Sequence, residues 1–252
     1  CYLHTPTRFL WEERHHYARH RGWPSLARLP LHGAFHLLRH WDVMAAQRPT
    51  QLLTNGRTSQ ARIRRYYQRE STILHPPVDL ATIPFAPASN RSYWLTGGRL
   101  VPYKQFDQCI LAANQLGAPL KIFGTGPEEA RLKRLAGPTV EFLGRVNEAQ
   151  KWELYQQAHG FLHPHIEDFG ITILEALASG IPVLARGAGG ALETVQDGLN
   201  GWHLKDSTAA TLAQAMQEHP TSSLDPAAIR ASVEPFDLPH FQDALLRYVH
   251  AD

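Results

Sequence analysis

The sequence predicts an α/β protein built on doubly wound parallel sheets, and three observations lead to this fold class. Short apolar runs alternate with segments of helical periodicity, strand then helix, over about 120 residues in the second part of the chain. The glycine-bearing turns of this part fall where these runs should end. No apolar run approaches the ~18 residues of a membrane-spanning helix. In such a sheet, ligands bind at the carboxyl ends of the strands, where these turns are expected.

The first part of the chain predicts a smaller set of elements, with a linker after it. In chain order they are a strand at 1–4, an irregular helical segment at 8–21, a break at 22–30, a helix at 31–48, a strand at 51–55, a helix at 58–69, a strand at 71–80 and a linker at 81–92. The linker is predicted from its prolines and their polar neighbours.

The second part predicts a longer strand and helix series. In chain order these are a strand at 93–98, a helix at 106–116, a strand and glycine turn at 120–126, a helix at 128–135, a strand at 140–146, a helix at 148–158, strands at 161–162, 182–185 and 201–204, and helices at 171–179, 208–218 and 238–249. The helix that begins near Ile171 should end at Gly180, a left-handed C-cap, with Pro182 preventing its continuation.

These elements suggest a two-domain organisation. Residues 1–80 are expected to be the second half of an incomplete first domain, and residues 93–235 a complete second domain. A C-terminal helix over 236–252 is expected to pack back on the first part. The chain opens on Cys1, inside a predicted strand, which suggests that earlier strands precede it.

Charge is distributed unevenly along the chain. Residues 1–75 hold 12 Arg and no Lys against four acids, whereas residues 76–252 hold 13 basic and 19 acidic residues. A basic first part favours an anionic partner, with a solvated arginine surface as the alternative.

Two cysteines provide neither a disulfide framework nor a metal motif, which suits a cytoplasmic protein.

Two carboxylates mark the central strand, loop and helix. Glu167 follows a strand and Glu175 lies about one turn into the next helix, with Gly170 between them. Gly170 would let backbone N–H groups approach an anion such as phosphate at the helix N-terminus. Glu175 could then accept hydrogen bonds from a ribose, while Glu167 reaches the group beyond the phosphates. The alternative is that both acids only cap the helix.

Other turns at the same edge add cations and glycines. Arg99 and Lys104 follow the first strand of this part and could neutralise a diphosphate leaving group. The glycine turns suggest a rim of backbone N–H groups around one extended ligand.

No metal set is predicted: His163 and His165 are expected to be polar loop residues, because no third ligand stands at a typical spacing. The chain has no P-loop and no dinucleotide fingerprint.

Together, these motifs resemble glycosyltransferase family 4, whose members are retaining, nucleotide-sugar-dependent enzymes with the two-Rossmann GT-B fold. The motifs that carry the resemblance are Gly98-Arg99-Leu100 with Lys104, Gly124-Thr125-Gly126-Pro127, Gly144-Arg145-Val146, Glu167 to Glu175, Gly189-Gly190 with Glu193, and in the first part CYLHTPTRFLW (1–11), Trp41-Asp42 and Pro76-Pro77-Val78-Asp79. One departure is Gly56, where the family usually has Ser. The family's first strands and glycine-rich loop would lie before Cys1.

The resemblance implies a role for each matching position. It places the donor diphosphate at Arg99, Lys104, Gly170, Ile171 and Thr172, the nucleoside at Glu175, Gly144, Arg145, Val146 and Gly124, and catalysis at Glu167 and His4. It implies no metal and no cofactor beyond the nucleotide-sugar substrate.

The predicted function is transfer of a sugar, with mannose from GDP-mannose favoured, to a hydroxyl on a glycan or lipid-linked acceptor, as in polysaccharide synthesis. The alternatives are a nucleotide-sugar epimerase and a catalytically inert nucleotide-binding GT-B fragment. Peripheral contact with the inner face of a membrane, through the arginine-rich first part, is a further expectation. Nucleic acid is not expected as a partner, because no recognition motif is present.

Overall fold

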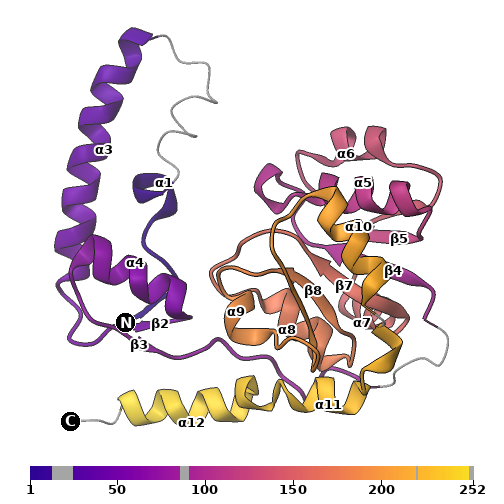
Figure 1. Ribbon diagram of the computed structural model, residues 1–252. Coiled ribbons are helices and arrows are strands. Elements are labelled where there is room, and N and C mark those ends of the chain that lie inside the picture. The colour runs from indigo at the N-terminus through magenta and orange to yellow at the C-terminus, as the bar shows by residue number, and fades with distance from the viewer. Residues whose placement is uncertain (13–24, 86–90, 220, 250–252) are drawn as a thin grey trace. The chain divides into compact units, whose positions relative to one another are not determined.

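The structure is a computed structural model that describes residues 1–12, 25–85, 91–219 and 221–249. Its contacts divide the chain into two units, Cys1–His75 and Pro76–Asp252 (Figure 1). Residues just after the division pack within the second unit, because the Val78 N–H donates to the carbonyl of Phe236 and the Val78 carbonyl accepts from the N–H of Leu238. Among the described residues, no helix combines the length and apolarity needed to cross a bilayer.

The first unit is a small parallel sheet with helices. Its elements are β1 (Tyr2–Leu3), α1 (Arg8–Trp11), α3 (Ser25–Ala46), β2 (Leu53–Thr54), α4 (Arg57–Tyr67) and β3 (Thr72–Ile73). The strands lie in the order β1-β2-β3 and are all parallel. Each is shorter than its predicted run, because only two residues of each strand find a partner.

The core of this unit forms around α4. Leu52, Ile63 and Tyr67 are buried together. Asp42 of α3 ties the helices to one another, since it accepts hydrogen bonds from the Trp11 indole at 2.8 Å and from the Tyr67 hydroxyl at 2.7 Å.

The predicted break at 22–30 is wrong over residues 25–30, because α3 begins at Ser25 and runs through Pro30. Proline removes one helical hydrogen bond, and the 22-residue helix keeps the others. Of the helical segment predicted at 8–21, α1 accounts for Arg8–Trp11, and residues 13–21 lie outside the described residues.

The second unit is built on a six-stranded parallel sheet. Its strands are β4 (Tyr93–Gly97), β5 (Leu120–Phe123), β6 (Val140–Gly144), β7 (Ala158–His163), β8 (Val183–Arg186) and β9 (Gly201–Leu204). Their order is β6-β5-β4-β7-β8-β9. The chain therefore winds outward from β4 to β6 and then crosses to β7 on the other side of β4. This makes β4 and β7 the switch point of the sheet, where ligands of such folds bind.

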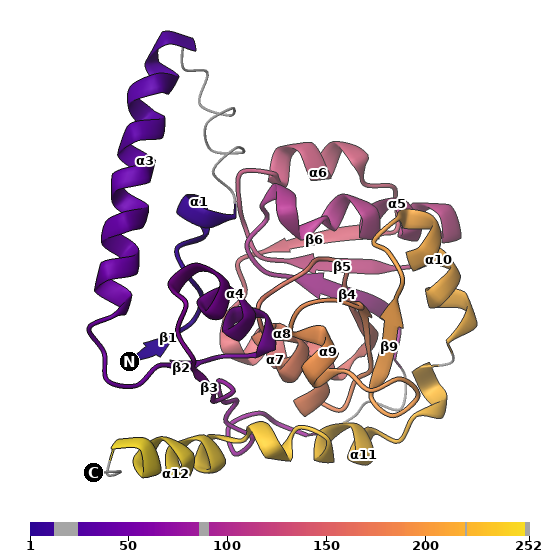
Figure 2. The same ribbon diagram turned by 60° about the vertical axis from the view of Figure 1, so that its left-hand side comes forward.

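Helices cover both faces of this sheet (Figure 2). The helices described in this unit are η1 (Pro102–Lys104), α5 (Phe106–Leu116), α6 (Glu129–Leu135), α7 (Glu148–Gln156), α8 (Ile171–Ala178), α9 (Ala191–Thr194), α10 (Ala209–Glu218), η2 (Thr221–Ser223), α11 (Pro226–Ala231), η3 (Glu234–Phe236) and α12 (Leu238–Val249). One buried cluster joins α7, α8, α9 and α11 to the sheet, and another joins α5, α6 and α10. The predicted doubly wound sheet is confirmed.

Most predicted boundaries lie within a few residues of the observed ones. The helix predicted at 148–158 is too long, because α7 ends at Gln156 and β7 already begins at Ala158, which pairs with Tyr93 of β4. The predicted end of α8 is confirmed, since Gly180 has a left-handed φ of 75° directly after the C-cap.

Candidate functional site

The loops that follow β4 and β7 meet through a buried ion pair. Lys104 ends η1, after β4, and its residue is 8% exposed. Its Nζ lies 2.8 Å from Oε1 of Glu167, in the loop after β7. Two residues that the sequence placed in separate motifs are therefore joined at the switch point of the sheet.

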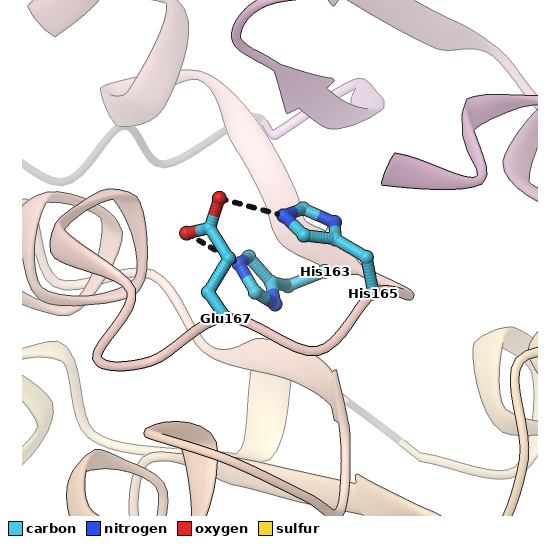
Figure 3. Close-up of side chains that lie close together, drawn as sticks. All are labelled: His163, His165 and Glu167. Atoms are coloured by element: carbon cyan, nitrogen blue, oxygen red, sulfur yellow. Dashed lines mark ion pairs between the residues drawn. The ribbon is translucent and has the colours of Figure 1, made fainter. Parts of the chain in front are cut away.

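Two imidazoles flank the same carboxylate (Figure 3). His163 Nε2 lies 3.5 Å from Oε2 of Glu167, and His165 Nε2 lies 3.1 Å from Oε1. Burial acts to raise the pKa of Glu167, but the two imidazoles outweigh burial and hold this pKa far below its usual range. Burial, aided by His163, lowers the pKa of His165 to about 4. Near neutral pH the site therefore contains an ionised Glu167 beside a neutral His165.

The expectation that His163 and His165 are polar loop residues is wrong for His163, whereas His165 does lie in the loop after β7, although it is buried. His163 is the last residue of β7, and the two residues are only 1% and 3% exposed. With Glu167 they form a group whose ligand atoms lie within 4.8 Å of one another, as a metal site requires. The Lys104 ammonium already neutralises the carboxylate, so a divalent cation would add uncompensated buried charge. The group does not fit a resident metal.

A cavity of about 480 Å³ opens at the carboxyl ends of β4, β5 and β6. Its lining residues are Gly98, Arg99, Phe123, Gly124, Thr125, Gly126, Pro127, Arg145, Val146 and Lys151. Three positions predicted to bind the nucleoside, Gly124, Arg145 and Val146, therefore share one cavity with Arg99. Gly144 ends β6 directly before them, with a left-handed φ of 66°.

Lys151 links this cavity to Glu175, and the sequence analysis missed it. Its Nζ lies 3.0 Å from Oε1 of Glu175 and 3.0 Å from Oε1 of Glu148. Burial acts to lower the pKa of Lys151, but the two carboxylates reverse this and raise it. The signal in the sequence was the Glu148/Lys151 spacing on α7, which also occurs on ordinary helix surfaces.

The N-terminus of α8 lies between the two carboxylates in sequence. Gly170 is its N-cap, with a left-handed φ of 89°, and a Cβ there would press on the Ile173 side chain at 3.0 Å. Ile171 is exposed, whereas the hydroxyl of Thr172 is buried and has no hydrogen-bond partner among the described residues. The first N–H groups of a helix also lack intrahelical partners. This end of α8 can therefore donate several hydrogen bonds to an anion.

The glycine turns do lie at one edge of the sheet, but four glycines have a reason other than a ligand. A Cβ at Gly124 would overlap the carbonyl oxygen of Gly98, and one at Gly126 would overlap that of Leu100. At Gly189 and Gly190 it would overlap the backbone of the loop after β7. These glycines let neighbouring loops pack backbone to backbone, so they shape the site without having to contact a ligand.

His4, the other predicted catalytic residue, belongs to the first unit. It is exposed, follows β1, and its ring lies edge-on to Tyr2 with centroids 5.1 Å apart. Its place in that unit agrees with a turn after a strand, as its sequence context predicts.

The family model described as glycosyl transferases group 1 matches residues 83–228, which is more than half of the chain. The chain belongs to this family. The matched segment begins before β4 and includes the cavity, the Lys104–Glu167 pair and α8.

Curated relatives of this group 1 chain include glycosyltransferases of several kinds. Glycogen synthase of Mycobacterium tuberculosis is 29% identical over 217 residues, covering 79% of this chain and 51% of the relative. A GDP-mannose-dependent phosphatidylinositol monomannoside mannosyltransferase of Corynebacterium glutamicum is 39% identical over 113 residues, covering 38% of this chain and 30% of the relative. The chain thus spans about half the length of the glycogen synthase relative.

Solved structures show the GT-B fold. Anabaena HepE in complex with UDP and glucose superposes with a TM-score of 0.75 at 21% identity, covering 85% of this chain and 67% of that one. Sucrose-phosphate synthase from Thermosynechococcus elongatus gives 0.71 at 20% identity, covering 99% and 67%. The predicted family and fold are confirmed, and the chain matches part of each of these larger proteins.

Proposed function

We propose that the chain is the donor-binding part of a retaining glycosyltransferase, which transfers a hexose from a nucleoside-diphosphate sugar to a hydroxyl. The observation that carries the proposal is the cavity at the carboxyl ends of β4, β5 and β6. It brings Arg99 together with three of the predicted nucleoside residues, Gly124, Arg145 and Val146, next to the switch point. Membership of the group 1 family supports the same reaction class.

In this proposal the donor lies along the edge of the sheet. The nucleoside occupies the cavity, and its ribose hydroxyls donate to Glu175. The diphosphate binds between Arg99, Lys104 and the N-terminus of α8, where cations and unpaired N–H groups favour an anion. The sugar then reaches Glu167, whose Oε1 is already paired with Lys104.

The proposed reaction uses the diphosphate itself to assist the transfer. The bond from the anomeric carbon to the diphosphate oxygen breaks, and its electron pair stays on the diphosphate. The acceptor oxygen bonds to the anomeric carbon on the same face, and its proton passes to the departing phosphate oxygen. Arg99 and Lys104 stabilise the negative charge that develops there. Glu167, whose pKa is far below its usual range, accepts from the sugar and does not supply a proton.

For the donor, we propose GDP-mannose. The support comes from relatives named as GDP-mannose-dependent mannosyltransferases, from Corynebacterium glutamicum at 39% identity and Mycolicibacterium smegmatis at 35%. Glycogen synthase relatives and the complex of HepE with UDP and glucose make UDP-glucose and ADP-glucose the comparison donors.

Calorimetric titration of the 252-residue chain with GDP, UDP and ADP, and with GDP-mannose, UDP-glucose and ADP-glucose, tests binding. NMR of the anomeric proton during incubation with a glycosyl acceptor tests transfer and retention. We expect GDP and GDP-mannose to bind more tightly than the other pairs. If none of the six binds, the proposed function is wrong, whereas tighter binding of a uridine or adenosine pair refutes only the choice of donor.

We further propose an acceptor at a membrane surface, which the charge of the first unit supports. Several arginines there are engaged within the fold: Arg69 donates to three backbone carbonyls, and Arg64 pairs with Glu70. Others, such as Arg48 and Arg65, are exposed. Exposed cations near an anionic bilayer contribute about 1 kcal/mol each, and salt screens them.

Helix α3 of the same unit adds apolar side chains that a lipid surface could accept. Those exposed on it are Leu37, Leu38, Trp41 and Met44. Co-sedimentation with anionic and neutral vesicles at low and high salt tests the proposal. We expect binding to the anionic vesicles that falls with salt. Binding that is absent, or indifferent to lipid charge, would leave the arginines as an ordinary solvated surface.

A further inference from the structure

His163 and His165 are buried polar side chains that the proposed reaction does not yet use. Their rings lie nearly parallel, 3.9 Å apart between centroids and 31° between planes. Aromatic rings surround them: Phe161 lies near His163, and Tyr103 and Phe106 lie near His165. Burial in this setting lowers the pKa of His165, and a neutral imidazole can still donate a hydrogen bond from its one N–H.

The ring nitrogens lack well-aligned partners within the described part of the chain. None of the four nitrogens of His163 and His165 meets the geometry of a hydrogen bond. Leaving a buried donor unpaired is costly, so such groups normally have a function or a partner. The carboxylate of Glu167 lies at hydrogen-bond length from one of them and just beyond it from the other, at 3.1 Å and 3.5 Å. A small rotation of each ring would align the N–H with its oxygen.

We propose that His163 and His165 are positioning residues, which donate from Nε2 to the two oxygens of Glu167 and hold this carboxylate toward the donor sugar. The inference rests on the proposed function, which places the sugar at Glu167. It deepens that function because it explains what orients a carboxylate carried on a loop. His163 is fixed by the pairing of β7 with β8, and the carbonyl of Pro164 accepts a hydrogen bond from Ser207.

The arrangement also limits how many sugar hydroxyls Glu167 can bind. An ionised carboxylate offers about four acceptor sites, two on each oxygen. On Oε1, Lys104 at 2.8 Å and His165 at 3.1 Å fill both. On Oε2, His163 takes one, which leaves one for a ligand. Glu167 should therefore accept from a single hydroxyl of the sugar, at Oε2.

Calorimetry with GDP and GDP-mannose, and with UDP and UDP-glucose as a second pair, tests this positioning role. The quantity compared is the ratio of the two dissociation constants, sugar nucleotide over nucleotide. We expect His165→Leu to raise this ratio about 10-fold, because a displaced Glu167 loses its hydrogen bond to the sugar hydroxyl. The affinity for the nucleotide alone should not change, since the nucleotide makes no bond to Glu167. His165→Gln, whose amide can donate near the Nε2 position, should restore the ratio to within about 3-fold of the wild type.

His159→Leu is the matched control, since His159 lies on β7, the strand that leads into the loop of His165, and packs near Trp94. An unchanged ratio in His165→Leu, or equal weakening of nucleotide and sugar nucleotide, would overturn the proposal. If His165→Leu does not fold, His165→Asn keeps a polar side chain, but its shorter amide cannot reach the Nε2 position and so cannot donate to Glu167 from there. Donor analogues that each lack one sugar hydroxyl test the number of hydroxyls that Glu167 binds. Removing one particular hydroxyl should weaken binding to the wild type but not to Glu167→Gln. If two hydroxyls behave in this way, Glu167 binds more than the single hydroxyl inferred above.

A measurement without any nucleotide separates this inference from the proposed function. Nitrogen-15 NMR of the histidine-labelled chain at pH 7 should show a proton on Nε2 of both His163 and His165, with His165 as a neutral ring. Protonation at Nδ1 alone, or a charged imidazolium in His165, would refute donation to Glu167. If the wild type binds no nucleotide, the proposed function is wrong. The protonated nitrogen of each ring still shows whether His163 and His165 donate to Glu167.

Discussion

Replacing Glu175 with alanine should weaken nucleotide binding while the rest of the cavity stays in place. Its side chain is only 17% exposed, and its Oε1 lies 3.0 Å from Nζ of Lys151, which lines the cavity. The hydroxyl of Tyr155 lies 3.4 Å from Oε2. The carboxylate is therefore held rigidly at the cavity, with acceptor sites left for the two hydroxyls of a ribose.

The expected loss follows from those contacts. A hydrogen bond to a charged group contributes about 1.5–3 kcal/mol, and Lys151 and Tyr155 already draw on the same oxygens. We therefore expect a net loss of about 1–3 kcal/mol of binding free energy, or roughly 5- to 150-fold in the dissociation constant. The free energy of unfolding should also fall by about 1–3 kcal/mol, because Lys151 keeps only Glu148, whose side chain is 75% exposed.

Titration calorimetry with GDP and UDP measures the binding loss, and urea unfolding confirms that the variant is folded during the titration. Glu175→Gln keeps the shape but removes the charge, so it should show a smaller loss. Glu218→Ala, an exposed substitution on α10, is the control. Equal affinity of the wild type and Glu175→Ala for the tighter nucleotide would remove Glu175 from the site and refute the reasoning.

Three further changes test other parts of the site. Lys104→Ala should weaken GDP binding about 10-fold, because a cation facing the diphosphate is lost, and should change guanosine binding little. Calorimetry measures both affinities, with Lys133→Ala, an exposed substitution, as the control. Burial lowers the pKa of His165 from 6.5 to about 4, so the unfolded chain takes up a proton that the folded chain does not. The free energy of unfolding should therefore fall, by up to about 3 kcal/mol from this group, between pH 7 and 4, and less steeply in His165→Gln. Gly124→Ala should cost more than about 2 kcal/mol of unfolding free energy in urea, because its Cβ would overlap the Gly98 carbonyl at a left-handed φ; an unchanged midpoint would contradict the steric argument.

The sequence alone was enough for the sheet of the second unit and for the edge that carries the site. Strand and helix alternation depends on periodicity within short windows, and parallel strands place all their carboxyl ends together. For that reason Arg99, Gly124 and Arg145 could be assigned to one edge before their cavity was known. The left-handed Gly180 after α8 was equally predictable, because a helix C-terminus is a local event.

Short apolar runs near prolines were less predictable. The three strands of the first unit have two residues each, since pairing between segments far apart in sequence decides their length. Helix α3 runs through Pro30 although a break was predicted there, because a long helix tolerates the loss of one hydrogen bond.

Only the tertiary structure decided which charges meet. Lys104 joins Glu167, and Lys151 joins Glu175, because the strand order places β4 beside β7 and brings α7 against α8. The burial of His165 followed in the same way, from the aromatic side chains of Tyr103 in η1 and Phe106 in α5. A chain's local pattern determines its elements and the edge where they end, but contacts between distant elements depend on strand order and packing, which no short window contains.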